Sequence, residues 1–235
     1  MKPWTKVADV VRAQRFELVD AAGKARASLA LEEDNPMLVL QDAAGNVRAM
    51  LTLMADGSPG LSLHDAAGKL RVGLSLVEED NPMLVLRDAA GKIRATLGVC
   101  EDETALRLHD AAGKAQIHLM AFPDGTDSGV ALHDAAGKAR AMLRLTADGS
   151  PALSLHDAAG KTRVILRLSE DKPGLSLSDA AGKIRAILGL SEDKPGLSLF
   201  DVTGKIRVIL GVSENEPVLV LLDAAGNVIW EAPQP

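Results

Sequence analysis

Apolar and polar residues alternate along most of this chain in short segments that are separated by turns. In one segment, Leu61 and Leu63 alternate with Ser62 and His64, which is the period-two pattern of a β-strand with one apolar face. After the turn that follows, apolar residues return at every second position as far as Leu76. The pattern therefore predicts two strands that share one continuous apolar face.

A short phrase, Asp-Ala-Ala-Gly-Lys or a close variant, joins the two strands and occurs ten times at intervals of 22 to 24 residues. A fixed period of this size is typical of repeat proteins, in which each unit buries its apolar face against its neighbours. The ten phrases begin at Asp20, Asp42, Asp65, Asp88, Asp110, Asp134, Asp157, Asp179, Asp201 and Asp223.

These repeats predict an all-β fold of about ten two-stranded units, stacked as an elongated β-solenoid or β-hairpin rod. We expect one repeat domain over residues 16–232, an N-terminal cap segment over 1–15 and a C-terminal tail over 233–235. The alternative is a five-bladed β-propeller with two repeats per blade. A longer phrase that recurs after two repeats, near Glu33 and Glu79, favours the propeller.

The aspartate and the glycine of each phrase are the predicted structural turn residues. An aspartate at the start of a turn can accept backbone N–H groups, and a glycine can adopt the positive φ that turns require. This prediction is made for three representative copies, with Asp65, Gly68, Asp157, Gly160, Asp179 and Gly182 as the turn residues.

The spacing also predicts how the two strands of a repeat are paired. A three-residue loop closed by Asp65 and Lys69 would place Leu63 opposite Arg71 and mix the two faces. Pairing His64 with Lys69 keeps the leucines of both strands on one face of the sheet. We therefore expect either an even-numbered hairpin loop or an arc of a solenoid. The second loop of each repeat varies in length, so we expect it to be exposed and loosely constrained.

The face opposite the leucines is not uniformly polar. Its positions include Met142, Ile165, Ile187 and Ile209, which we predict to be an interface, because exposing such side chains to water is unfavourable. A second copy of the chain is the expected cover, with an intramolecular second layer as the alternative. Other proteins could also bind through the variable loops.

Two recurring polar residues are candidates for chemistry. An arginine follows most turn glycines by three residues. We expect it to pair with acidic residues of neighbouring repeats, and an anion-binding stripe is the alternative. Histidine precedes four of the turns, at His64, His109, His133 and His156. Other copies have unrelated residues at that position, so we expect a tolerant surface site and not a metal site.

Composition narrows the classes of function. The net charge of −6, with basic residues spread along the repeats, argues against a nucleic-acid surface. Aromatic residues are scarce, and Cys100 is the single cysteine. No apolar run of membrane-spanning length and no signal peptide is visible, so we expect no membrane insertion and a cytoplasmic location by default. Release without the Sec pathway, into a virion or an extracellular assembly, stays open.

No catalytic constellation accompanies the repeats. The chain has no phosphate-binding glycine loop, no Ser–His–Asp order and no metal-ligand spacing. An active site needs its catalytic groups only once. Ten copies of one phrase therefore favour a structural role for that phrase. We therefore expect no enzyme activity, no catalytic residue, no cofactor and no bound metal.

The repeats at residues 174–185 and 196–207 read Gly-Leu-Ser-Leu-x-Asp-x-x-Gly-Lys-x-Arg. This phrase resembles repeats in uncharacterised bacterial tandem-repeat proteins, a resemblance that covers nearly the whole chain and implies no activity. It is also loosely similar to the shaft repeats of trimeric viral fibres, although the period here is longer. The second resemblance implies an elongated trimer. Together these observations predict a structural β-repeat protein, a homo-oligomeric scaffold or fibre segment. A propeller-like module that binds a ligand or a protein is the alternative.

Overall fold

The computed structural model describes residues 10–78, 80–123, 125, 128–214 and 216–232. These residues form twenty β-strands and no helix. They divide into two compact units, Met1–Cys100 and Glu101–Pro235. Most of the expected cap segment, including Trp4, and the expected tail over 233–235 lie outside the described residues. Residues 10–14 are exposed and precede the first strand.

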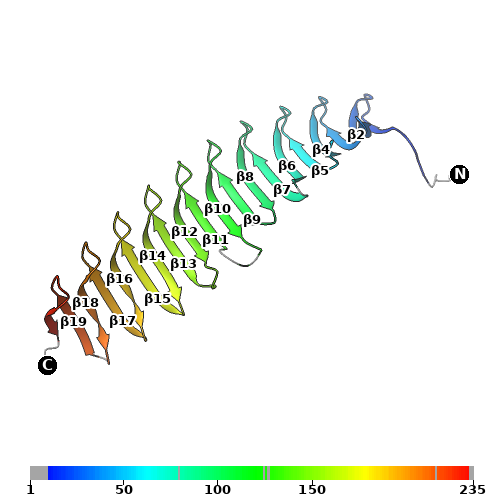
Figure 1. Ribbon diagram of the computed structural model, residues 1–235. Helices are drawn as coiled ribbons and strands as arrows, with labels where there is room; N and C mark the ends of the chain where they lie inside the picture. Colours follow the sequence, from blue (N-terminus) through cyan, green and yellow to red (C-terminus); the bar gives the residue numbers. More distant parts are fainter. Residues whose placement is uncertain (1–9, 79, 124, 126–127, 215, 233–235) are drawn as a thin grey trace. The chain divides into compact units, whose positions relative to one another are not determined.

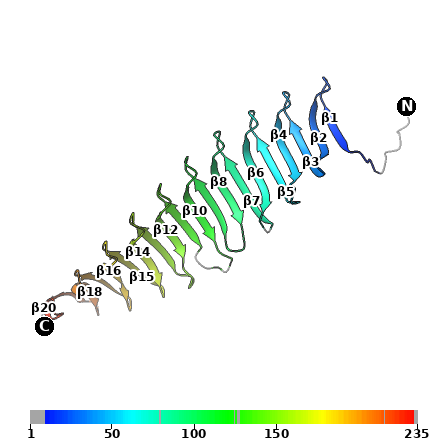
Figure 2. The ribbon, with the colours of Figure 1, turned by 45° about the horizontal axis from the view of Figure 1, so that its top comes forward.

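The first unit contains eight strands that pair antiparallel in chain order (Figures 1 and 2). The strands are β1 (Arg15–Val19), β2 (Ala25–Glu32), β3 (Asn35–Gln41), β4 (Val47–Leu53), β5 (Pro59–His64), β6 (Leu70–Val77), β7 (Asn81–Arg87) and β8 (Ile93–Val99).

The second unit contains twelve strands with the same consecutive antiparallel pairing. They are β9 (Thr104–His109), β10 (Ala115–Ala121), β11 (Gly129–His133), β12 (Ala139–Leu145), β13 (Pro151–His156), β14 (Thr162–Ser169), β15 (Lys172–Ser178), β16 (Ile184–Ser191), β17 (Lys194–Phe200), β18 (Ile206–Ser213), β19 (Glu216–Leu222) and β20 (Val228–Ala232).

This pairing confirms the all-β fold of tandem two-stranded repeats and selects its hairpin form. A propeller would break the ladder after every four strands, whereas the eight strands of the first unit pair without a break. The propeller alternative is therefore wrong. In each unit the sheet is open, because the strands continue as a meander and do not close on themselves.

The predicted pairing of the two strands was wrong, because the strands contain a β-bulge that the prediction did not include. Asp65 and Lys69 do close a three-residue loop, since the Asp65 N–H donates to the Lys69 carbonyl at 2.9 Å. Two residues further on, however, Leu63 faces Val72 and not Arg71. Arg71 is the extra residue of a β-bulge, and the bulge returns the apolar side chains to one face.

The short second loops also differ from the expectation of loose constraint. Ser169 and Lys172 pair across a loop of only two residues, Glu170 and Asp171, and both of these have positive φ, 51° and 60°. This is the φ pattern of the tight turn that favours hairpins. In two other repeats the second loop has three residues and a positive-φ glycine, Gly57 or Gly149. The spacing between the leucines on the two sides of the loop changes with the loop length, so the apolar side chains remain on one face of the sheet.

Each sheet is a single layer with two different faces. The leucine face carries the alternating apolar positions. In β15–β18 these are Pro173, Leu175, Leu177, Ala186, Leu188, Leu190, Pro195, Leu197, Leu199, Val208, Leu210 and Val212. The mixed face carries the positions between them, which in the same strands are largely serine, glycine and isoleucine.

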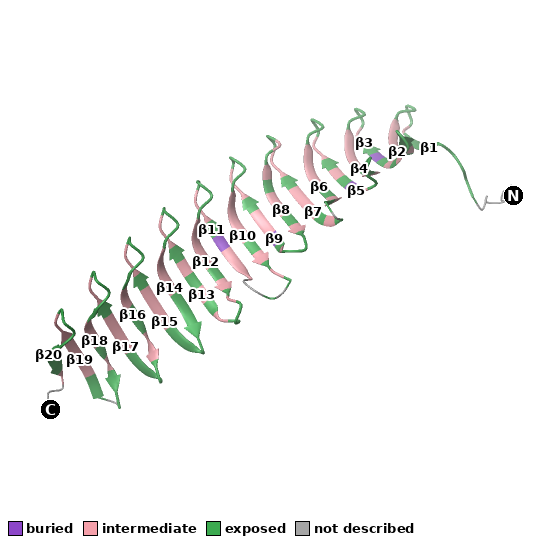
Figure 3. Ribbon diagram, viewed as in Figure 1, coloured by how far each residue is buried: buried purple, intermediate pink, exposed green. Residues whose placement is uncertain are grey.

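Neither face is covered by a second layer of the same unit, and the core is correspondingly small (Figure 3). Among the described residues, the buried hydrophobic side chains are Val39, Ala105 and Ala131, all on the mixed face. No polar or charged side chain within that part of the chain is classed as buried.

Candidate interaction surface

The repeated phrase forms a hydrogen-bonded turn in every repeat. In the third copy, the Asp65 carboxylate oxygen Oδ1 accepts the N–H groups of Ala67 and Lys69, at 2.9 and 3.0 Å. The Gly68 N–H donates to the Asp65 carbonyl, and Gly68 has φ of 76°. The structure places Asp157, Gly160, Asp179 and Gly182 in the same arrangement. These contacts explain why the phrase needs an aspartate first and a glycine fourth.

The turn contacts hold the aspartates in their ionised form. In the third copy, the backbone N–H of Lys69 is the main cause of a lowered pKa for Asp65, and burial opposes it. The pKa is lowered in nine of the ten turn aspartates, which are Asp42, Asp65, Asp88, Asp110, Asp134, Asp157, Asp179, Asp201 and Asp223.

In several repeats the recurring arginine ties the turn to the next repeat. Arg140, the bulge residue of its hairpin, contacts Asp134 Oδ2 of its own turn at 3.3 Å. Its Nε donates to the carbonyl of His156 in the following repeat, at 2.9 Å. Arg48 and Arg71 make the same pair of contacts. The expected arginine ladder is therefore present, but its acidic partner lies in the same repeat and its neighbouring partner is a backbone carbonyl.

The turn lysines add a second connection in the same direction. Lys138 Nζ donates to the carbonyl of Ala158 in the following turn, at 2.8 Å. Lys69, Lys161 and Lys205 do the same with the turns that follow them. Lysine and arginine at these positions are thus explained by contacts within the sheet. The alternative of an anion-binding stripe is not needed to account for them.

Arg140→Gln should lower the melting temperature by a few degrees. Glutamine can keep the bond to the turn aspartate, as Gln116 does with Asp110 Oδ2 at 3.0 Å, but it cannot also reach the next repeat. The lost bond to His156 is worth about 1 kcal/mol, or about 2–4 °C in a chain of this size. Thermal melts followed by circular dichroism measure the shift. Arg167→Gln, which changes an exposed arginine outside the turns, is the control.

Large apolar side chains are exposed on the leucine face of both units. Leu166, Leu188 and Leu210, on alternate strands of the second unit, are 47%, 50% and 47% exposed. In the first unit Leu29 and Leu51 are similarly exposed. Pro173 and the leucines beside it line shallow hollows on this face, one of about 320 Å³. Sequence reasoning identified this face but assumed that the fold would bury it.

The predicted interface residues lie on the mixed face. Ile165, Ile187 and Ile209 occupy one cross-strand row, where Ser176 and Ser198 separate them. Met142 lies in the same row, opposite Ala131 and Ser154. Ile187 is exposed, whereas Met142, Ile165 and Ile209 are half-buried. The serines interrupt this apolar row, so the mixed face is less apolar than the leucine face. Its role as an interface stays a prediction.

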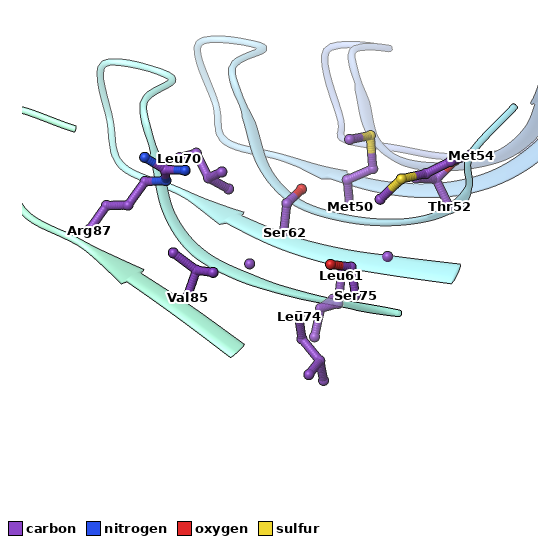
Figure 4. Close-up of a pocket in the computed structure, with 12 residues that line it drawn as sticks. Met50, Thr52, Met54, Leu61, Ser62, Leu70, Leu74, Ser75, Val85 and Arg87 are labelled. Carbon is purple, nitrogen blue, oxygen red and sulfur yellow. The ribbon is translucent and has the colours of Figure 1, made fainter. Parts of the chain in front are cut away.

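A hollow of about 250 Å³ lies on the mixed face of the first unit (Figure 4). Met50, Ser62 and Arg87 point to one side of the strands there, and Leu74 points to the other. Ser62 Oγ and Arg87 Nε are buried atoms without a hydrogen-bond partner. Gly73 leaves open space in the lining, because a Cβ at that position would meet no atom within 4 Å.

The turn-preceding histidines lie on the mixed face beside their turns. His156 contacts Ser154 Oγ at 2.9 Å and Thr162 Oγ1 at 3.2 Å, and His109 Nδ1 lies 3.2 Å from the carbonyl of Gly113. Within the described ranges, no group of three or more His, Cys, Asp or Glu side chains could hold a metal ion. His64 and His133 lie on the same mixed face, beside their turns.

One further polar cluster was not predicted from the sequence. Glu103 pairs with Arg107 and lies 3.4 Å from His118 Nε2. Burial, followed by Arg107 and His133, lowers the pKa of His118. Burial therefore favours the neutral form of the imidazole over the charged form that an ion pair with Glu103 would need. Cys100, at the end of the first unit, is exposed.

The comparisons with known proteins do not identify a family. No family model and no curated protein matches the chain. Among solved structures, the chain is similar to the TCP10 domain of Danio rerio CPAP, at 14% identity and a TM-score of 0.31, over 83% of this chain and 94% of that one. A Photorhabdus luminescens Tc holotoxin pore matches at 8% identity and a TM-score of 0.21, over 89% of this chain and 15% of that one. These scores are too low to carry an argument about fold or function.

The described part of the chain has no helix that is long and apolar enough to cross a bilayer.

Proposed function

We propose that this chain is a non-enzymatic structural protein, a scaffold or fibre segment, that acts as a homo-oligomer. The observation that carries the proposal is the leucine face, a surface of leucine, valine, alanine and proline that no other layer of its unit covers. Leaving such a face in water is unfavourable, because each half-exposed leucine keeps about 1 kcal/mol of burial energy unused.

The total surface supports the same proposal. The chain exposes 15981 Å². A compact monomer of the same mass, 24.6 kDa, would expose roughly 10,000 Å². Ordering the backbone costs about 1–2 kcal/mol per residue. A single-layer sheet with three buried hydrophobic side chains in its described part has little burial to offset that cost. Association supplies the missing burial, and the resemblance to fibre-shaft repeats favours a trimer.

Light scattering coupled to size-exclusion chromatography tests this proposal. We expect a mass of two or three times 24.6 kDa at micromolar concentration, which dilution shifts only slowly toward the monomer. A folded chain that remains at 24.6 kDa up to about 100 μM would contradict the proposal.

A ligand-binding role is the second candidate, and the hollow on the mixed face favours it. Its lining offers the apolar surface of Met50 and Val85 together with the unpartnered Ser62 Oγ and Arg87 Nε. Small-molecule sites combine apolar walls with a few polar groups in this way. A thermal-shift screen with short aliphatic carboxylates tests this role. Stabilisation that Arg87→Met abolishes would support it, and no stabilisation at millimolar ligand would contradict it.

A further inference from the structure

We propose that neighbouring copies pack their leucine faces together, with the turn edge of one copy beside the second-loop edge of the other. The inference rests on the proposed function, because it names the surface through which the copies associate. It differs from the sequence-based prediction, which placed the interface on the isoleucine row of the mixed face.

The leucine face calls for a partner that is itself apolar and periodic. Along β15–β18 its residues are all leucine, alanine, valine or proline, so it has no side chain with which to recognise a polar or charged partner. Its rows repeat with the strand spacing of about 4.8 Å. A second copy of the chain carries an identical leucine face, with the same spacing and composition. Two such sheets can interdigitate as the layers of a β-sandwich do.

The leucine face offers large apolar side chains for a second copy to cover, since Leu166, Leu188 and Leu210 are each about half exposed. A standard interface buries about 800 Å² on each partner. The hollows of about 320 and 210 Å³ beside Pro173 and Pro195 lie on the same face, where leucines of a second copy would fill them.

Charge sets the relative direction of the two copies. At the second-loop edge, exposed acidic residues such as Glu170, Asp171, Glu192 and Asp193 come together. At the turn edge each aspartate is accompanied in most repeats by a lysine and an arginine, so that edge has a net positive charge. Placing turn edge beside second-loop edge brings opposite charges together, whereas the reverse arrangement brings like charges together.

Two glutamates disfavour pairing of β1 with β20 between copies. Among the described residues, β1 and β20 each pair with a single strand, and both carry a glutamate in the central row of the mixed face. Glu17 lies opposite Ser28, and Glu231 lies opposite Val220. A charged side chain at such a position discourages edge-to-edge pairing in natural sheets. Pairing of β20 with β1 of another copy would bring the two glutamates into one row.

Two adjacent residues give a matched test of the face. Leu188 lies on the leucine face and Ile187 on the mixed face of the same strand, and both are exposed in one copy. Leu188→Asp should reduce the mass measured by light scattering to 24.6 kDa, and Ile187→Asp should leave the oligomer intact. Circular dichroism shows whether each variant keeps its β-structure.

The outcomes separate the inference from the proposed function. If the wild-type chain is a monomer, the proposed function and the inference both fail. If the wild type is an oligomer that Ile187→Asp dissociates and Leu188→Asp does not, the scaffold proposal survives and the leucine-face inference is overturned. The same holds if neither variant changes the mass.

Disulfide cross-linking tests the relative direction of the two copies. It does not require a substitution that disrupts the interface. In a Cys100→Ser background, one cysteine replaces Ala181 at the turn edge or Glu192 at the second-loop edge, both of which are exposed. Co-expressed A181C and E192C chains should form disulfide-linked pairs on mild oxidation, and A181C chains alone should not. Efficient linking of A181C to itself, with none between the two variants, would overturn the arrangement.

Discussion

Gly129→Val is expected to separate β11 from β12 and to lower the stability by about 3 kcal/mol or more. A Cβ on Gly129 would overlap the Leu143 carbonyl and approach the Cα of Arg144 to 2.9 Å. Those atoms belong to the paired strand, since Gly129 faces Arg144, so the backbone itself must move. Thermal melts should show a loss of about 6–12 °C for a chain of this length.

Gly174→Ala is the matched control for this prediction. Gly174 also lies in a strand, but a Cβ at that position meets no atom within 4 Å, and its φ is not in the left-handed region. We expect it to change the melting temperature by less than about 2 °C. An equal loss in both variants would show that the effect of Gly129→Val is not the close approach to β12.

The second large effect is a loss of thermal stability when the pH is lowered. The lowered pKa values of nine turn aspartates mean that the folded chain binds protons less readily than the unfolded chain, whose aspartates have a pKa of about 3.9. The stabilisation is therefore complete above that value and is lost as the pH falls through the folded pKa values. Because nine turns contribute together, the melting temperature should fall steadily as the pH is lowered from 5 to 2.

A variant with four asparagines at Asp134, Asp157, Asp179 and Asp201 separates this cause from general acid effects. Asparagine can still accept a backbone N–H but does not titrate. Compared with the wild type, the variant should be less stable at pH 7, and its melting temperature should change less between pH 5 and pH 2. A pH profile parallel to that of the wild type would exclude the turn aspartates as the cause of acid sensitivity.

The fold could be predicted from the sequence because one local pattern is repeated ten times. Alternation such as Leu61–Ser62–Leu63 fixes strands and faces, and the turn phrase fixes where the chain reverses. The bulge at Arg71 could not be read from this pattern. A bulge adds one residue to a strand but has no residue type of its own that would mark it in the sequence. Strict alternation without a bulge excludes the three-residue loop that is present.

The proposed interaction surface could be predicted only in part. The apolar character of both faces is visible in the sequence, but which face a fold leaves open depends on how many layers it builds. A period of 22 residues supplies two strands of six to eight residues and nothing that could form a second layer, as β15 and β16 illustrate. This observation was available from the spacing, and it would have pointed to Leu188 before Ile187.

The contacts between repeats give the array a direction. Many turns donate forward, through a lysine or an arginine, to carbonyls of the repeat that follows, as Lys138 and Arg140 do. The tenth turn has Asn227 and Ile229 at these two positions, and the Asn227 amide donates back to its own Asp223. The connection between repeats thus works in one direction along the chain, and the tenth turn accepts from the ninth without offering a donor beyond itself.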